Sequence, residues 1–143
     1  MSKLNIYNLP IRAHGISPKG NYERKFSSLT REFAELDTEQ GCTPLGIDVV
    51  TLLPGKKDWP YHLHATQWEI YIAIEGVARM RLNENYIDMV PGDSIQCAPG
   101  AAHQIINESE SPFTYWLVTN SPEFDVCYYP DSDKLSGGER ILG

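Results

Sequence analysis

The sequence predicts an all-β protein in which short strands form a closed or double-sheet fold. From Gly46 onward, short runs rich in β-branched and aromatic residues alternate with turns, and this regular spacing is typical of sandwiches and barrels. Asn83-Glu84-Asn85 and Pro91-Gly92-Asp93 contain the residues that tight turns prefer. Helical spacing of apolar residues occurs only over 29–36. The predicted architecture is therefore a set of strands with one short helix.

The first part of the chain is predicted to be an extended arm. Pro10, Gly15, Pro18 and Gly20 interrupt regular structure up to about residue 26, which leaves room for one short strand at Leu4–Leu9. The helix follows over 29–36. The predicted strands then cover residues 47–53, 68–74, 77–82, 86–90, 94–97, 103–106 and 113–119.

These elements divide the chain into three parts. Residues 1–40 form the N-terminal arm with its short helix, 41–129 form the β-barrel domain, and 130–143 form a C-terminal tail. The tail contains Ser136-Gly137-Gly138 and is predicted to be loosely held. A chain of 143 residues is long enough for one domain with its own hydrophobic core.

Composition and charge exclude several classes of protein. Hydrophobic residues make up 41% of the chain and aromatic residues 10%, which is typical of a globular protein and not of a disordered one. No apolar stretch has the length of a membrane span. A net charge of -7 disfavours nucleic acids and anionic membranes as partners.

Two further features predict a cytoplasmic location. The N-terminus, Met1 to Ile6, has no apolar core of a signal peptide. Cys42, Cys97 and Cys127 form an odd set without close spacing. This set argues against a disulfide framework and suits a reducing compartment, with the three thiols predicted to be inert.

Three of the four histidines fall in one short pattern with a glutamate. The pattern is His62-Leu63-His64, four residues, Glu69, six residues and Gly76, followed later by Gly92, ten residues, His103, three residues and Asn107. Imidazole nitrogens and a carboxylate are ligands suited to a divalent first-row transition metal. In a strand, His62 and His64 point to the same face, so both can project into an interior. Such a site leaves one or two coordination positions open, as in catalytic sites.

This pattern resembles the two motifs of the cupin superfamily, over roughly residues 45–120. The stretch from His62 to Gly76 fits the first motif, although Gly55 stands one residue too far upstream. Gly92, Gly100, His103 and Asn107 fit the second motif, although its proline appears as Pro99, one position late. The resemblance implies a double-stranded β-helix, or jelly roll, in which His62, His64, Glu69 and His103 coordinate one divalent ion: iron(II), manganese, nickel or zinc.

The chain is also similar to a narrower group of small single-domain cupins that are named sugar-phosphate isomerases. The residues behind this likeness are Gly41 with Pro44-Leu45-Gly46, then Leu53-Pro54-Gly55, and the late run from Tyr128 to Lys134. In that group an acidic pair usually precedes the region of the ligand glutamate, where this chain has Gln67-Trp68.

Other residues near the pattern admit two interpretations each. Glu69 is a metal ligand or a carboxylate that orients a histidine ring. Strand alternation places Tyr71 on the Glu69 face, where it contacts a substrate as a catalytic residue or fills the core. Arg79 and Arg81 share a face and are either solvated or an anion clamp.

Two functions from different classes fit these observations. The first is a metal-dependent enzyme, of the dioxygenase or the isomerase and lyase type, on a small molecule with adjacent oxygen donors. The second is a non-catalytic module in which the metal anchors a small ligand, as in a sensor or carrier. We favour the enzyme, because cupins so often are enzymes.

The protein is predicted to be a homodimer. A small barrel leaves sheet edges and one apolar sheet face unprotected, and two-fold pairing is the commonest remedy. The arm around Leu4–Leu9 is the element predicted to extend the sheet of the second copy.

Overall fold

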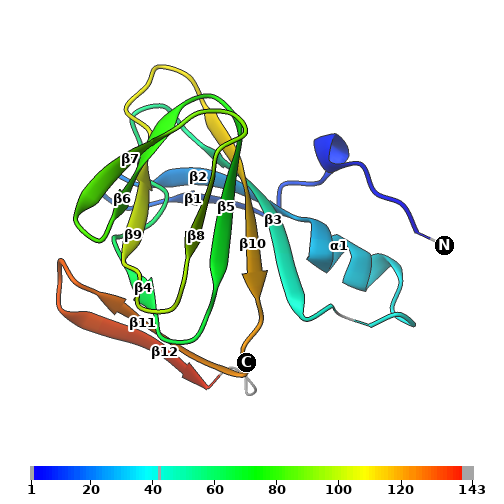
Figure 1. Ribbon diagram of the computed structural model, residues 1–143. Coiled ribbons are helices and arrows are strands. Elements are labelled where there is room, and N and C mark those ends of the chain that lie inside the picture. Colours follow the sequence, from blue (N-terminus) through cyan, green and yellow to red (C-terminus); the bar gives the residue numbers. More distant parts are fainter. Residues whose placement is uncertain (1, 42, 140–143) are drawn as a thin grey trace.

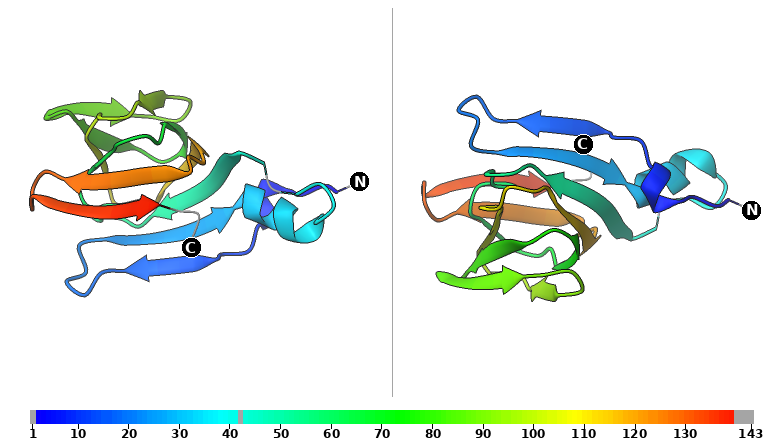
Figure 2. Two further views of the ribbon diagram at one scale, coloured as in Figure 1. Left: turned by 90° about the horizontal axis from the view of Figure 1, so that it is seen from below. Right: turned by 90° about the horizontal axis from the view of Figure 1, so that it is seen from above.

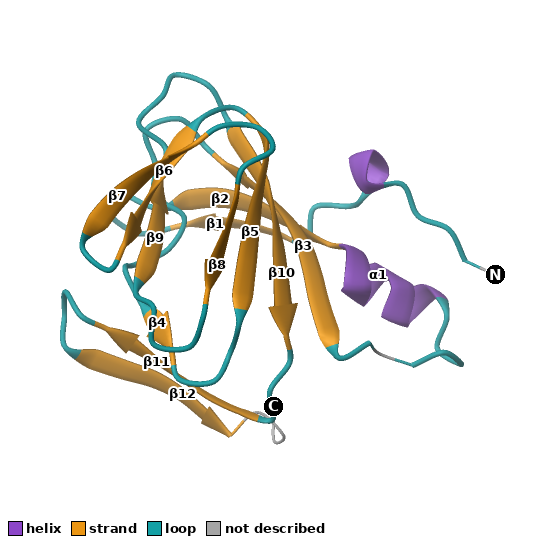
Figure 3. Ribbon diagram, in the orientation of Figure 1, coloured by secondary structure: helices purple, strands orange, loops and turns teal. Residues whose placement is uncertain are grey.

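The protein is described by a computed structural model, which covers residues 2–41 and 43–139. Its strands form three sheets that enclose one core (Figures 1 and 3). The largest sheet has six strands in the order β1 (Ala13–Ile16), β2 (Glu23–Ser28), β3 (Leu45–Leu52), β10 (Phe113–Asn120), β5 (Glu69–Glu75) and β8 (Ser94–Cys97). Neighbouring strands in it are antiparallel. The all-β prediction is confirmed.

Two three-stranded sheets lie across from the large sheet (Figure 1). One has the order β7 (Asn85–Met89), β6 (Ala78–Leu82) and β9 (His103–Ile106), and the other β12 (Lys134–Glu139), β11 (Phe124–Tyr129) and β4 (Leu63–His64). The core between the layers is supplied by both sides. Val50, Phe113 and Tyr115 come from the large sheet, and Met80 and Ile105 from the opposite layer. In β5, for example, every second residue is buried and faces this core.

The predicted helix is confirmed as α1 (Leu29–Leu36). The Ser28 hydroxyl accepts a hydrogen bond from the Arg31 amide and so caps the helix. Figure 2 shows that α1 and the N-terminal segment lie to one side, next to β3 and away from β6 and β7. The hairpin of β1 and β2 continues the large sheet beyond β3.

The strand predicted at Leu4–Leu9 is wrong. A 3₁₀ turn, η1 (Ile6–Asn8), occupies this segment, because the Asn5 side chain accepts a hydrogen bond from the Tyr7 amide and caps the turn. The strand of the arm that reaches the edge of the sheet is β1 instead.

The C-terminal tail is more ordered than the sequence suggests. β12 pairs with β11 in register from Phe124 with Glu139 to Tyr129 with Lys134. The domain boundaries at 40 and 130 stay predictions. Among the described residues, no helix is long and apolar enough to cross a membrane. The cytoplasmic location stays a prediction.

Candidate metal centre

The structure brings the four predicted ligands together from all three sheets. His64 lies on β4, Glu69 begins β5, and His103 begins β9. His62 lies just before β4, where its backbone exchanges two hydrogen bonds with His103, at 3.2 and 2.8 Å. The Glu69 Oε1 atom lies 2.7 Å from His64 Nε2, 3.1 Å from His103 Nε2 and 3.9 Å from His62 Nε2. One ligand atom from each residue can therefore reach a single ion.

Each histidine ring is held at its Nδ1 atom by an acceptor. His62 Nδ1 donates to the Pro60 carbonyl at 2.8 Å, and His103 Nδ1 donates to the Ala101 carbonyl at 2.9 Å. His64 Nδ1 lies 2.7 Å from the Asp125 carboxylate. Carbonyls and carboxylates only accept hydrogen bonds, so Nδ1 carries the hydrogen in all three rings. The Nε2 lone pair of each neutral ring therefore faces the centre, and this donor set fits a divalent transition metal.

Without a metal, the protonated rings of His64 and His103 bind the Glu69 carboxylate. Burial and the charge of His103 together lower the pKa of His62 to about 4. Burial also opposes the charged forms of His64 and His103. Hydrogen bonds to Cys127 and Glu69 nevertheless raise the pKa of His64 to about 11, and hydrogen bonds to Cys97 and Glu69 raise that of His103 to about 10. The metal-free centre at neutral pH thus contains a neutral His62 between two cationic rings that share the Glu69 carboxylate.

Metal binding is expected to release about two protons near pH 7, because His64 and His103 must lose theirs to become ligands. Raising the pH toward the pKa values of these rings removes competing protons, so metal affinity should increase with pH. Calorimetry of metal binding in buffers with different ionisation enthalpies measures the released protons. A binding enthalpy that is the same in every buffer would contradict this prediction.

Tyr71 lies at the centre, as strand alternation predicted. Its hydroxyl is 3.2 Å from Glu69 Oε2 and 3.0 Å from His103 Nε2, and the side chain is buried. Burial raises the pKa of Tyr71 well above its usual value, and the Glu69 charge adds to this effect. The hydroxyl therefore keeps its proton and donates a hydrogen bond to the Glu69 carboxylate. A role of Tyr71 in substrate contact stays a prediction.

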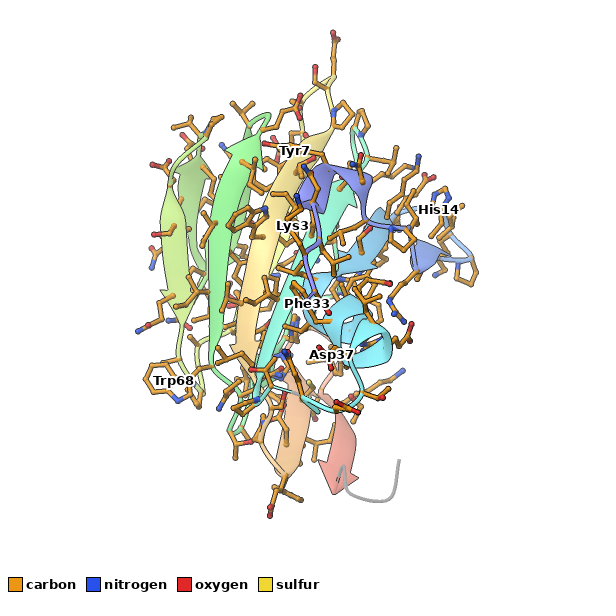
Figure 4. All side chains as sticks on the ribbon, turned by 90° about the vertical axis from the view of Figure 1, so that its right-hand side faces the viewer. Lys3, Tyr7, His14, Phe33, Asp37 and Trp68 are labelled. Carbon is orange, nitrogen blue, oxygen red and sulfur yellow. The ribbon has the colours of Figure 1, made fainter. Side chains whose placement is uncertain are left out.

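The remaining candidates of the sequence lie elsewhere. Arg79 pairs with Asp88 and Glu108 at 3.8 Å. Arg81 binds Asp131 at 2.7 Å and stacks on the Tyr61 ring. Neither arginine lines the cavity next to the metal centre. The Arg79 side chain is 40% exposed, which fits the solvated interpretation, whereas the Arg81 side chain is only 17% exposed and is held by its ion pairs. His14 lies on β1 at the outer edge of the molecule (Figure 4), paired with Glu23.

The three cysteines have different surroundings. Cys97 is buried beside Met80, and Cys127 lies 3.3 Å from His64 Nδ1. Cys42 is outside the described residues.

Sequence reasoning missed Asp125, which fixes the His64 ring. Its second carboxylate oxygen accepts from the Thr66 amide at 2.9 Å, so Asp125 joins β11 to the turn between β4 and β5. No motif spacing points to Asp125, because β11 lies far along the chain and alternates like any other strand. The only feature of the sequence that could have pointed to Asp125 is a carboxylate within an otherwise mostly apolar strand.

Replacing Asp125 by Asn should weaken metal binding by about 10- to 100-fold. The amide can still accept from Thr66, but its NH₂ group then faces the Nδ1–H of His64 and drives the ring to the wrong tautomer. Competition with a chelating dye measures the affinity. Asp88→Asn on the exposed face of β7 is the control, and equal affinities for the two variants would contradict the orienting role.

A cavity of about 730 Å³ opens from the metal centre. Besides the candidate ligands His62, His64 and Glu69, its wall contains Tyr71 and the buried pair Asp58 and Tyr115. A second part of the wall comes from β2 and α1. The N-terminal segment therefore helps to build the site, which the sequence did not indicate.

Comparison with known proteins agrees with this geometry. Residues 48–119 match the cupin domain family. A candidate sugar phosphate isomerase from Acidithiobacillus ferrooxidans has a similar structure, with a TM-score of 0.78, 23% identity and coverage of 91% of this chain and 80% of that one. A sugar phosphate isomerase of the cupin superfamily from Silicibacter pomeroyi gives a TM-score of 0.77, 26% identity and coverage of 94% and 85%.

More distant structures carry other activities on this fold. The polyketide cyclase from Streptomyces resistomycificus has a TM-score of 0.64 and 17% identity, with coverage of 85% of this chain and 80% of that one. No curated protein matches the chain. The match over half of the chain, with both histidine motifs converging on one centre, shows that this protein belongs to the cupin family.

Proposed function

We propose that the protein is a metal-dependent enzyme that acts on a compact molecule with adjacent oxygen donors, by proton transfer as in isomerases and lyases. The observation that carries this proposal is the convergence of three Nε2 atoms and the Glu69 carboxylate at one end of a cavity of about 730 Å³. A divalent ion held there, iron(II), manganese, nickel or zinc, would polarise a carbonyl or hydroxyl oxygen of the substrate. The volume suits one small ligand and not a polymer.

Asp58 supplies the acid or base that such chemistry needs. Its carboxylate is buried in the cavity wall and accepts hydrogen bonds from the Trp59 and Ile105 amides, at 2.7 and 3.0 Å, and from the Tyr115 hydroxyl at 3.3 Å. Burial raises the pKa of Asp58 above its usual value. A buried carboxyl group with a raised pKa is a candidate to take and return a proton. Tyr71 would orient the substrate beside Glu69.

The isomerase and lyase type is favoured over the dioxygenase type because Asp58 and Tyr115 are built into the wall as a hydrogen-bonded pair. The similarity to the Silicibacter pomeroyi protein, at 26% identity, supports the same choice. Fold alone does not decide the reaction.

The test is a panel of small hydroxy acids, diketones and sugar phosphates, each assayed with the four metals, with and without oxygen. We expect turnover that does not need oxygen. Asp58→Asn should lower kcat by at least about 100-fold, whereas the exposed control Tyr86→Phe should leave it unchanged. Turnover that requires oxygen would support a dioxygenase. Binding without turnover across the panel would support a non-catalytic ligand-binding module.

We also propose that the protein forms a homodimer. β1 is an edge strand with all four residues exposed; Ile16 at its end is 60% exposed, and Ile11 shortly before it is 59% exposed. Trp116 pairs in register with Val49 and Ile72 on the outer face of the large sheet, so this face is apolar. Both features favour pairing with a second copy. Light scattering should give about twice the chain mass of 16.1 kDa. A mass of one chain across a wide concentration range would contradict the dimer.

A further inference from the structure

Arg24 is a cation in the cavity wall, and among the described residues no carboxylate forms an ion pair with it. It lies on β2, outside the residues that match the cupin domain, and its side chain faces the same cavity as the metal ligands. Its guanidinium stacks on the Trp59 ring at 4.9 Å. Arg12, Arg79 and Arg81 all have ion pairs, but among the residues that the structure describes none pairs with Arg24 within 4.0 Å.

The acidic groups that face Arg24 are Asp48 and Asp58, and each carboxyl group has other hydrogen-bond partners. Asp48 and Asp58 both interact with it through space, yet burial raises the pKa of each. The Asp58 carboxylate oxygens already accept hydrogen bonds from two backbone amides and from the Tyr115 hydroxyl. Arg24 interacts with the Tyr115 hydroxyl, but no carboxylate of the described residues lies within 4.0 Å of its other donors, and the Trp59 indole ring holds the guanidinium in place.

A second cation stands on the same wall. Arg31 lies in the first turn of α1, lines the cavity and stacks on the Phe26 ring at 5.6 Å. Its side chain is exposed, and within the described part of the chain it too forms no ion pair. Arg24 and Phe26 are alternate residues of β2, which places both on the cavity face of that strand. The arm thus adds two arginines to a cavity whose other end is the metal centre.

We propose that Arg24, assisted by Arg31, binds an anionic group of the substrate, a carboxylate or a phosphate. The inference rests on the proposed function, because it assumes that the same molecule reaches the metal centre with its oxygen donors. A guanidinium fork matches the oxygens of either anion with two parallel hydrogen bonds. Arg24 then selects an acidic substrate and sets which end of it faces the metal.

The test uses two pairs of compounds that share their metal-binding oxygens and differ in one anionic group. Dihydroxyacetone phosphate is compared with dihydroxyacetone, and malate with lactate. Zinc-loaded protein is titrated with each compound, followed by calorimetry and by the NMR signal of the Trp59 indole. The wild type should bind the more charged member of one pair at least about tenfold more tightly. The pair that shows this preference identifies phosphate or carboxylate as the group that Arg24 binds.

Variants decide whether Arg24 carries that preference. Arg24→Gln should bring the two members within about twofold of each other, and Arg24→Lys should retain part of the difference because it keeps the charge. Arg79→Gln, outside the cavity, is the matched control and should bind like the wild type. Thermal unfolding checks that each variant is folded. If Arg24→Gln does not fold, the preference of Arg24→Lys decides the test. Equal binding of both members by the wild type, or an unchanged preference in the Arg24 variants, would overturn the proposal.

A further titration tests the anion site independently of the proposed function. Inorganic phosphate and acetate are titrated into metal-free protein, and the Trp59 indole signal should shift with at least one of them in the wild type but not in Arg24→Gln. This result would support the anion site even where no metal or turnover is found. A protein that binds zinc and turns over neutral compounds, but shows no anion-dependent shift, would retain the proposed function and lose the role of Arg24.

Discussion

Replacement of His103 by Ala is expected to lower metal affinity by more than about 100-fold, beyond the loss typical of a residue that only orients a ligand. His103 is the candidate ligand that β9 contributes, and its Nε2 lies 3.1 Å from the Glu69 carboxylate. Without this imidazole, His62, His64 and Glu69 remain on one side of the ion. Elemental analysis of protein purified with an excess of metal should find about one ion per chain in the wild type and close to none in the variant.

His14→Ala is the matched control, because His14 is the histidine outside the motifs and lies on the exposed edge strand β1. This variant should keep the full metal content. The wild type should also unfold at a higher temperature with metal than without, since an ion that binds only the folded state stabilises it, and His103→Ala should lose this difference. Full metal content in His103→Ala would show that the four-ligand assignment is wrong.

Three of the four candidate ligands could be predicted because their signals are local. His62 and His64 are two residues apart, so strand alternation points both side chains to the same face. Glu69 follows His64 by five residues, after a short turn into the next strand. The distant His103 was found through the resemblance of its surroundings to a known motif. Asp125, Asp58 and Arg24 could not be found in this way. Their roles depend on which strands become neighbours, and Asp125 is separated from His64 by 61 positions.

The same distinction explains the fold. The hairpin between β6 and β7 was predicted from Asn83-Glu84-Asn85, and Asn83 and Glu84 indeed have positive φ angles of 47° and 68°. β1 and β2 were not predicted, because β1 is exposed on both faces and β2 reads Glu-Arg-Lys-Phe-Ser-Ser, so neither shows alternating hydrophobicity. β2 is a strand because β3 offers it a register of hydrogen bonds. Such tertiary pairing overrides weak local preference.

Replacement of Asn107 by Ala is expected to destabilise the fold by about 3 kcal/mol, because several buried polar groups lose their partners at once. The Asn107 side chain is fully buried. Its amide nitrogen donates to the carbonyls of Leu52, Leu53 and Ser111, at 3.2, 3.4 and 2.8 Å. Its oxygen accepts from the amide and hydroxyl of Ser109, at 3.0 and 2.6 Å. One side chain thus joins the end of β9 to the end of β3 and to the turn before β10.

Urea unfolding of metal-free protein, followed by circular dichroism, measures this loss. Asn85→Ala is the control, because Asn85 is exposed on β7 and should change the free energy of unfolding by less than about 0.5 kcal/mol. The folded fraction of Asn107→Ala should still bind one metal ion, since His103 is held by its own backbone bonds to His62 and by Ala101. Asn107 would then stabilise the fold, whereas His103 would bind the metal, although both residues belong to one sequence motif. A loss below about 1 kcal/mol in Asn107→Ala would show that water replaces the broken hydrogen bonds.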